Sequence, residues 1–343
     1  MRKGYYHYLP KDYFDGLYER VVAKLARGQN VLISAMRGGG GKTFLNLFLN
    51  FSKKDGLFPK IYYYDPELES KKLVDFVGEM VNVSGKKIIV VRLFENLENK
   101  REVLETLNSL RHPFPEKLTF LLIVNHTALA EPEDYFGYST QFFSERFYIQ
   151  PFNLKETIRM IEINSKFYGW RINERNYNKI YALSGGNPRL IKYICKDIDE
   201  KQATLDSISK FLANPAIKFQ LDYFTKLLLQ EKTENLKVLG ILDEKPRIKS
   251  ELLAKYFVDY QSRIVDELYP TLTNLERKIF TYLYENKNRI VSVDKLGDLT
   301  EMAGHEFSLW AIYKLISRVK SKIAKLFKIR AIKGQGYLLE TAN

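Results

Sequence analysis

The chain has 343 residues, of which 45% are hydrophobic and 28% charged, so it is long enough for about two or three folded domains and is not intrinsically disordered. Its single cysteine excludes an internal disulfide, and its four histidines are too scattered to form a zinc finger. With 54 Lys and Arg against 41 Asp and Glu, the net charge of +13 favours nucleic acid as a partner ahead of an anionic membrane surface, although a solvated lysine-rich surface gives the same composition. The longest apolar runs have only strand length, so we expect a cytoplasmic protein with no membrane partner.

The first 150 residues alternate strand-like apolar runs with helical patterns. Apolar spacing predicts a helix over residues 12–27 and an apolar-faced helix over 44–53. Strands are predicted over residues 31–35, 60–65, 87–94 and 118–124. Strands that alternate with helices favour an α/β domain with a mostly parallel sheet covered on both faces.

The remaining residues are mainly helical in pattern. Helices are predicted over residues 154–169, 173–184 and 189–199, followed by a small helical unit over 205–262. The last part has an amphipathic helix (272–288), a second helix (291–299), a long basic helix (308–326) and a hairpin that turns at Gly334 and Gly336. We therefore expect four domains, comprising residues 1–150, 151–204, 205–265 and 270–343.

The strongest chemical signal is the segment MRGGGGKT, residues 36–43, between a predicted strand and a predicted helix. In a phosphate-binding loop, backbone N–H groups and a helix N-terminus surround the phosphates, so residues without Cβ are needed where the backbone approaches the ligand. A lysine then reaches the β and γ phosphates, and a hydroxyl at the first helical turn binds Mg²⁺. Met36 replaces the usual first glycine, and a flexible glycine turn is the alternative interpretation. The candidate residues for ATP or ADP are Gly38, Gly39, Gly40, Gly41, Lys42 and Thr43, with Thr43 as the Mg²⁺ ligand.

With this loop, the first 200 positions resemble the P-loop ATPases of the AAA+ and STAND type, a class that includes origin-recognition proteins. The resemblance implies an α/β P-loop NTPase domain with a helical lid. Asn125, at the end of an apolar strand, matches the family's sensor 1 position, and Arg189, after Gly-Gly-Asn-Pro, matches its sensor 2 arginine. Both have ordinary alternatives, because Asn at a strand end is commonly a turn residue and Asn-Pro commonly starts a helix.

The acid that binds Mg²⁺ in these ATPases is missing from the matching strand. Arg92 and Leu93 stand where the family has an Asp and a following acid. Glu95 is the candidate catalytic acid, and Asp65, after another strand, is a second candidate. Phosphoryl transfer depends on the metal and on a positioned water, so we expect nucleotide binding with slow or absent hydrolysis.

Residues 272–340 resemble the α+β winged-helix effector domains of the OmpR/PhoB type, with which bacterial regulators bind promoters. The matching segments are LTNLERKIFTYL for the first helix, ISRVKSKI (316–323) for the recognition helix and IRAIKGQGY (329–337) for the wing. The family's antiparallel sheet ahead of the first helix is not evident, and residues 235–262 instead resemble the winged unit of origin-type ATPases. An apolar stripe at positions 312, 315, 316, 319 and 323 leaves basic side chains on another face for phosphates or base edges. The candidate DNA-binding residues are Lys314, Arg318, Lys320, Lys322, Lys325, Arg330 and Lys333.

Three functions fit these patterns. The first is a nucleotide-controlled regulator that binds ATP at the loop and double-stranded DNA at the winged helix. The second is an active AAA+ ATPase of the origin-recognition or remodelling type, and the third is a signalling scaffold whose winged helices bind proteins. The resemblance also suggests assembly into a homo-oligomer on nucleotide binding.

Overall fold

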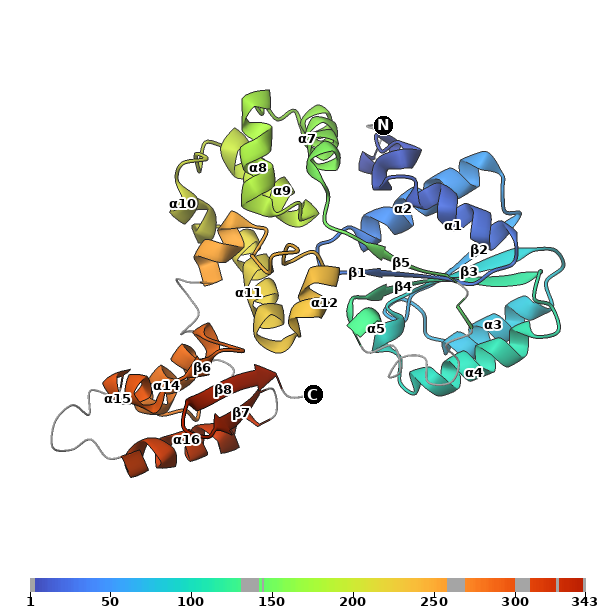
Figure 1. Cartoon of the computed structure of the whole chain (residues 1–343). Coiled ribbons are helices and arrows are strands. Elements are labelled where there is room, and N and C mark those ends of the chain that lie inside the picture. The colour runs from blue at the N-terminus through green and yellow to red at the C-terminus, as the bar shows by residue number, and fades with distance from the viewer. Residues whose placement is uncertain are drawn as a thin grey trace. The chain divides into compact units, whose positions relative to one another are not determined.

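The computed structural model describes residues 4–130, 142–143, 145–257, 269–299, 309–324 and 327–341. The chain divides into two compact units, Met1–Gln220 and Leu221–Asn343, and each is described by itself (Figure 1). The finer division into four domains stays a prediction. None of the described helices is long and apolar enough to cross a membrane.

A five-stranded parallel sheet forms the centre of the first unit, as the alternating pattern predicted. Its strand order is β2-β3-β4-β1-β5, and all neighbouring strands are parallel. The strands are β1 (Val31–Ala35), β2 (Lys60–Tyr64), β3 (Lys87–Arg92), β4 (Leu118–Asn125) and β5 (Glu145–Ile149). The sequence did not indicate β5, because this edge strand is short and only its last residue is buried.

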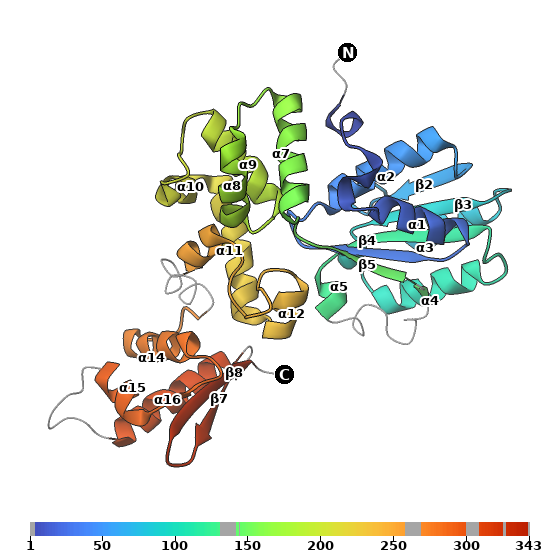
Figure 2. The same ribbon diagram turned by 45° about the horizontal axis from the view of Figure 1, so that its top comes forward.

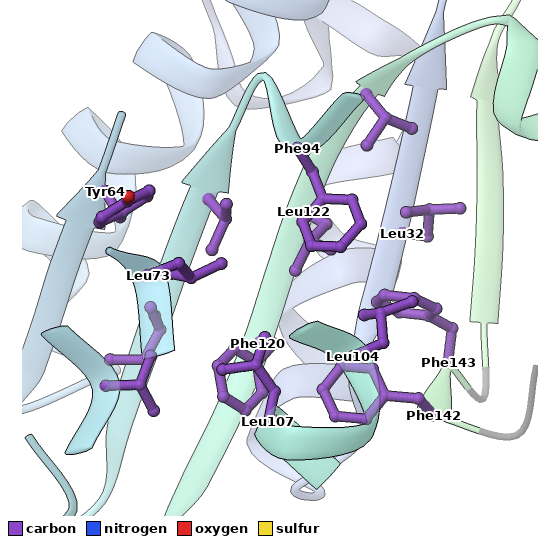
Figure 3. Packing of buried hydrophobic residues seen from close by; sticks show 14 of the residues in the cluster. Leu32, Tyr64, Leu73, Phe94, Leu104, Leu107, Phe120, Leu122, Phe142 and Phe143 are labelled. Atoms are coloured by element: carbon purple, nitrogen blue, oxygen red, sulfur yellow. The ribbon is translucent and has the colours of Figure 1, made fainter. Parts of the chain in front are cut away.

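Helices cover both faces of this sheet. In Figures 1 and 2, α1 (Leu17–Ala26) and α2 (Gly41–Asp55) lie on one face, and α3 (Leu73–Val81) and α4 (Lys100–Arg111) lie on the other. Alternate residues of a strand point to the same face, so every second residue of β4 from Leu118 to Val124 joins the core beneath α3 and α4. Figure 3 shows Phe120 of this set beside Leu107 of α4, and Leu122 beside Phe94.

The predicted helix over residues 12–27 is interrupted near its start. A short 3-10 helix, η2 (Lys11–Phe14), comes first, and α1 begins only at Leu17. Between them Asp15 and Gly16 have φ angles of 45° and 71°. This left-handed backbone cannot continue a right-handed helix. The apolar residues on the two sides of the turn happen to keep helical spacing, so the sequence predicted one continuous helix.

The described residues of the first unit contain further α-helices. They are α5 (Thr127–Ala130), α7 (Leu154–Tyr168), α8 (Tyr177–Ser184), α9 (Pro188–Asp199), α10 (Ile208–Ala213) and α11 (Pro215–Gln230), the last of which continues past the unit boundary. The start of α9 is fixed by Asn187, whose side chain accepts a hydrogen bond from the Leu190 N–H, with Pro188 in the first turn. The predicted helix start at Asn-Pro is therefore confirmed.

From position 269 onward, the described residues of the second unit form three helices and a three-stranded antiparallel sheet. The unit contains α12 (Thr233–Val238), α14 (Asn274–Glu285), α15 (Val293–Leu299) and α16 (Leu309–Ile323), with β6 (Ile290–Val291), β7 (Phe327–Ile332) and β8 (Gly336–Thr341) in the order β6-β8-β7. The predicted apolar stripe of α16 is buried at all five positions. The predicted hairpin is also present: a Cβ on Gly336 would lie 2.0 Å from the Val291 carbonyl oxygen, so only glycine fits there.

Candidate functional site

The glycine-rich loop lies at the carboxyl edge of the parallel sheet. β1 ends at Ala35 and α2 begins at Gly41, so the predicted strand, loop and helix are all present. The Gly39 N–H donates to the Met36 carbonyl oxygen over 2.8 Å and closes a tight turn. Only 3% of Met36 is exposed, so the residue that replaces the usual first glycine packs into the interior.

Gly38 and Gly40 have a backbone that other residues rarely adopt, with φ angles of 78° and 107°. A side chain at either position would also meet a close neighbour. A Cβ on Gly38 would lie 2.6 Å from Gln220 Oε1, and one on Gly40 would lie 3.1 Å from the Phe14 ring. The two glycines therefore let α11 and η2 approach the loop backbone closely.

The start of α2 offers donors for an anion. The first N–H groups of an α-helix lack intrahelical acceptors and the helix dipole is positive at that end, so anions bind there. Lys42 is exposed at this end, and its ammonium group makes no hydrogen bond or ion pair within the described residues. Thr43 lies half-buried in the same turn. This arrangement can hold a phosphate chain at the predicted position.

Two arginines lie at the loop: Arg37 is part of it and Arg189 lies beside it, and the sequence indicated only Arg189. Arg189, in the first turn of α9, donates from Nη1 to Gln220 Oε1 over 3.2 Å. Arg37, within the loop, lies over the Phe219 ring at 4.4 Å. Burial, and then the positive charge of Arg37, lower the pKa of Arg189. Burial and the neighbouring charge both disfavour the charged form of the Arg189 guanidinium, and a bound anion would stabilise it.

Arg92, at the position of the missing metal-binding acid, is paired with Asp65. Its Nη1 donates to Asp65 Oδ2, and its Nη2 lies 3.8 Å from Glu67 Oε2. Burial opposes ionisation of Asp65, but the Glu67 N–H, the Tyr63 hydroxyl and Arg92 together hold the pKa of this carboxyl below its ordinary value. Asp65 therefore serves as the counter-ion of Arg92, and we do not propose it as the acid of the site.

Glu95 lies close to Asn125, which is the predicted sensor position. Leu93, with φ 55°, turns the chain out of β3 into the 3-10 helix η3 (Phe94–Asn96), which packs against β4. The Asn125 N–H hydrogen-bonds to the Glu95 carboxylate, and Asn125 pairs with Ala35, the residue directly before the loop. The structure thus brings Glu95, Asn125 and the loop together at one edge of the sheet.

The carboxylate of Glu95 is chemically unusual among the described residues near the loop. Its Oε2 is buried and has no hydrogen-bond partner among the residues that the structure describes. Burial raises the pKa of Glu95 above its ordinary value, although the N–H groups of Glu95 and Asn125 act in the opposite direction. A carboxylate that has one oxygen without a partner in the described residues and a raised pKa is suited to accept a proton from a bound water.

Asn125 is less free to sense a phosphate than its position suggested. Its Oδ1 accepts hydrogen bonds from the Thr127 N–H, over 3.0 Å, and from the Thr127 hydroxyl. This is the turn geometry that asparagine commonly adopts after a strand. Any contact of the Asn125 side chain with a nucleotide would therefore use its Nδ2 group.

The described residues at this edge offer few side chains that could bind Mg²⁺. The described residues contain no group of three or more His, Cys, Asp or Glu side chains that could hold a metal ion. Of the predicted acids and hydroxyls in the described residues, Asp65 is paired with Arg92, so the Thr43 hydroxyl and the Glu95 carboxylate are the candidate oxygen donors. These residues suit a Mg²⁺ that arrives with nucleotide phosphates rather than one bound by the protein alone.

The basic residues of α16 and the hairpin differ in what they contact. Lys322, predicted to bind DNA, instead donates to Glu276 Oε2 and to the Thr271 carbonyl oxygen, each over 2.7 Å. Arg318 Nε lies 3.8 Å from Glu276 Oε1, and Arg330 Nη2 lies 3.2 Å from Glu340. Residues 314–333 contain no acid, but Glu276 and Glu340 from elsewhere in the second unit lie next to some of their basic side chains.

Three exposed lysines of the predicted DNA-binding set have no ion pair within the described residues. They are Lys314 and Lys320 on α16 and Lys333 in the hairpin turn. Lys325 lies outside the described residues. We therefore retain Lys314, Lys320 and Lys333, together with the exposed part of Arg318, as the proposed contacts for phosphate.

Exposed aromatic side chains on α16 were missed by the sequence analysis. Trp310 is 67% exposed and Tyr313 is 47% exposed, and Lys314 Nζ lies 4.7 Å from the centre of the Trp310 ring. The sequence could have indicated that these two rings are exposed, because both positions fall outside the apolar stripe that packs into the core. Large exposed aromatic groups beside lysines are typical of a binding surface.

No protein-family model matches the chain, and no curated protein matches it. The RuvB Holliday junction branch migration motor of Thermotoga maritima is a similar solved structure, 12% identical, with 95% of this chain and 92% of that chain covered and a TM-score of 0.42. The Orc1 protein of Aeropyrum pernix in complex with DNA is 11% identical, with 99% and 93% covered and a TM-score of 0.41. The replication initiator DnaA bound to AMPPCP and single-stranded DNA is 13% identical, with 90% of each chain covered and a TM-score of 0.44. At these values the likeness carries no argument about chemistry.

Proposed function

We propose that the chain binds ATP or ADP at residues 36–43. The observation that carries this proposal is the passage from the buried strand β1, through glycines at φ 78° and 107°, to the open N-terminus of α2. Lys42 and Arg189 add positive charge at the same loop. Backbone donors and cations that no carboxylate of the described residues neutralises are, together at one place, the requirements for binding a phosphate chain.

Isothermal titration calorimetry with ATP tests this proposal on the full chain. Lys42→Ala removes the charge that would reach the phosphates, so we expect its ATP binding to be lost. Lys53→Ala is the matched control, because Lys53 is exposed in the last turn of the same helix and should bind ATP as the wild type does. Equal ATP affinity in the wild type and in Lys42→Ala would contradict the assignment.

Hydrolysis, if it occurs, is proposed to depend on Glu95. The acid expected at the end of β3 is replaced by Arg92, and the nearby Asp65 is consumed in an ion pair, which favours slow turnover. The unpartnered Oε2 of Glu95 beside Asn125 favours the second candidate function, an active ATPase. Turnover far below about 10 per second, the usual enzyme median, is expected for the wild type.

Phosphate release from ATP decides between these two candidates. Glu95→Gln keeps the shape of the side chain but cannot accept the proton, so it should abolish the residual turnover. Glu98→Gln is the matched control, because Glu98 is exposed three residues later. Unchanged turnover in Glu95→Gln would exclude Glu95 as the catalytic base.

We also propose that the second unit binds double-stranded DNA as a winged helix, with α16 in the major groove and the β7–β8 hairpin against the neighbouring minor groove. Three helices with a three-stranded antiparallel sheet, and a hairpin next to a basic helix, support this proposal. Lys314, Lys320 and Lys333 supply the charge for phosphates, and Arg318 has the planar fork that suits a guanine edge.

Gel shifts of the full chain on random duplex DNA, over a salt series, test the DNA proposal. If about three lysines meet phosphates, log K should fall with log salt at a slope of about −3. The series run with and without ATP shows whether nucleotide controls DNA binding. Failure to bind duplex DNA at low salt would instead favour the protein-binding scaffold.

Assembly of several copies on nucleotide binding and a cytoplasmic location stay predictions of the sequence. Sedimentation velocity with and without ATP tests the predicted assembly.

A further inference from the structure

Gln220 is a polar residue that is fully buried against the glycine-rich loop. It belongs to the first unit, on α11, and 0% of it is exposed. Its Nε2 donates to the Arg37 carbonyl oxygen over 2.9 Å, and its Oε1 accepts from Arg189 Nη1 over 3.2 Å. Burial of an amide is costly unless both ends are hydrogen-bonded, and here both ends are. One side chain therefore connects the loop to the start of α9.

The amide oxygen of Gln220 stands where an anionic oxygen would be expected. It lies 2.6 Å from the position that a Cβ on Gly38 would take, so it rests directly on the loop backbone. It also accepts the hydrogen bond of Arg189, a residue type that normally binds carboxylate or phosphate oxygens. No carboxylate in the described part of the chain pairs with Arg189, so a neutral amide is its acceptor.

We propose, building on the nucleotide-binding function argued above, that Gln220 is an internal competitor of the nucleotide phosphates. In the free protein, Arg189 donates its hydrogen bond to the Gln220 amide oxygen. When a nucleotide binds the loop, Arg189 donates to a phosphate oxygen instead, and its bond to the amide is lost. The bond to a charged phosphate oxygen is stronger than the bond to an amide, so the exchange is favourable, but the lost bond reduces the apparent affinity of the nucleotide.

A positioning role for Gln220 has the opposite consequence. If the amide served to hold Arg189 in its phosphate-binding orientation, removal of the amide would weaken nucleotide binding, because the arginine would have to be ordered by the ligand. As a competitor, Gln220 has the reverse effect, and its removal strengthens binding. The direction of the affinity change therefore separates the two roles.

Calorimetric titration of the full chain with ATP measures that direction. Gln220→Met keeps the length of the side chain and removes both polar atoms, so we expect ATP affinity to rise about tenfold, the value of one hydrogen bond to a charged group. Gln230→Met makes the same replacement at an exposed position of α11 and should leave the affinity unchanged. In an Arg189→Ala background the gain from Gln220→Met should disappear, since the two residues act through one bond.

Gln220→Asn provides a second route if the apolar variant folds poorly. Asparagine keeps the amide on a side chain that is one carbon shorter, so the amide cannot reach both the Arg37 carbonyl oxygen and Arg189. ATP affinity should again rise. Circular dichroism of each variant confirms the fold. Unchanged or weaker ATP binding in the folded variants would overturn the competitor role while leaving nucleotide binding intact. Absence of ATP binding in the wild type would overturn the proposed function itself.

Discussion

Lys322→Ala should destabilise the second unit. The residue lies on the basic helix α16, but its ammonium group faces Glu276, of which 0% is exposed, and donates to it over 2.7 Å. Removal of one partner from a buried ion pair typically costs about 3–5 kcal/mol, because the other charge stays buried alone. The Lys322 side chain is 29% exposed, so water recovers part of this cost, and we expect a loss of about 2–3 kcal/mol.

Urea denaturation of the full chain measures this loss. Trp170 and Trp310 are the two tryptophans, so in a Trp170→Phe background the fluorescence of Trp310 reports on the second unit. Lys320→Ala is the matched control, because Lys320 is exposed on the same helix without an ion pair in the described part of the chain, and its free energy of unfolding should change by less than about 0.5 kcal/mol. Equal stability of Lys322→Ala and Lys320→Ala would refute the reasoning.

The same pair predicts a dependence on pH. Burial opposes ionisation of Glu276, but Lys322 and the Thr273 N–H hold the pKa of its carboxyl below the ordinary value. A depressed carboxyl pKa stabilises the folded state above the unfolded pKa of about 4.3, and this contribution is lost as the pH falls through the folded pKa. The wild type should therefore lose stability below about pH 4, and its advantage over Lys322→Ala should narrow there, because a protonated Glu276 needs no counter-ion.

Three further outcomes are expected. Gly38→Ala should destabilise the first unit by about 1–2 kcal/mol in thermal unfolding, since φ is 78° and a Cβ meets Gln220, and an unchanged melting temperature would contradict the loop geometry. Charge removal in Lys320→Ala or Lys333→Ala should flatten the salt slope of DNA binding by about one unit each, and a slope equal to that of the wild type would remove the residue from the interface. Trp310→Ala should weaken DNA binding at every salt concentration without changing the slope, because the side chain carries no charge, and full affinity would place the ring outside the interface.

Local sequence patterns predicted the parts of this protein that depend on local chemistry. The strand, loop and helix around residues 31–55, the capped start of α9 and the buried stripe of α16 all follow from short-range spacing and residue type. Such features need few distant partners, because a cap or an amphipathic face is decided within a few turns of helix. The edge strand β5 was missed for the converse reason: its place is fixed by pairing with β1, more than 100 residues earlier.

Distant pairing also explains what could not be predicted of the site. In the sequence, Lys322 is not distinguishable from the other lysines of α16, because its partner Glu276 is 46 residues away. Gln220 lies within an ordinary helical pattern, and only its contacts with Arg37 and Arg189 give it a role at the loop. Single-sequence spacing shows which residues share a face but not which side chain a distant element brings to them.

Hydrogen–deuterium exchange of the full chain, with and without saturating ATP and Mg²⁺, tests the central claim most directly. If phosphates bind at the glycine-rich loop, those N–H groups of residues 38–44 that lack an acceptor in the free protein acquire one, and the exchange of this segment should slow strongly in the wild type but not in Lys42→Ala. Residues 187–191, at the start of α9, should slow as well, because Arg189 is ordered by the same ligand. If calorimetry shows that ATP binds while exchange at residues 38–44 is unchanged, the nucleotide site lies elsewhere and the account of the glycine-rich loop is wrong.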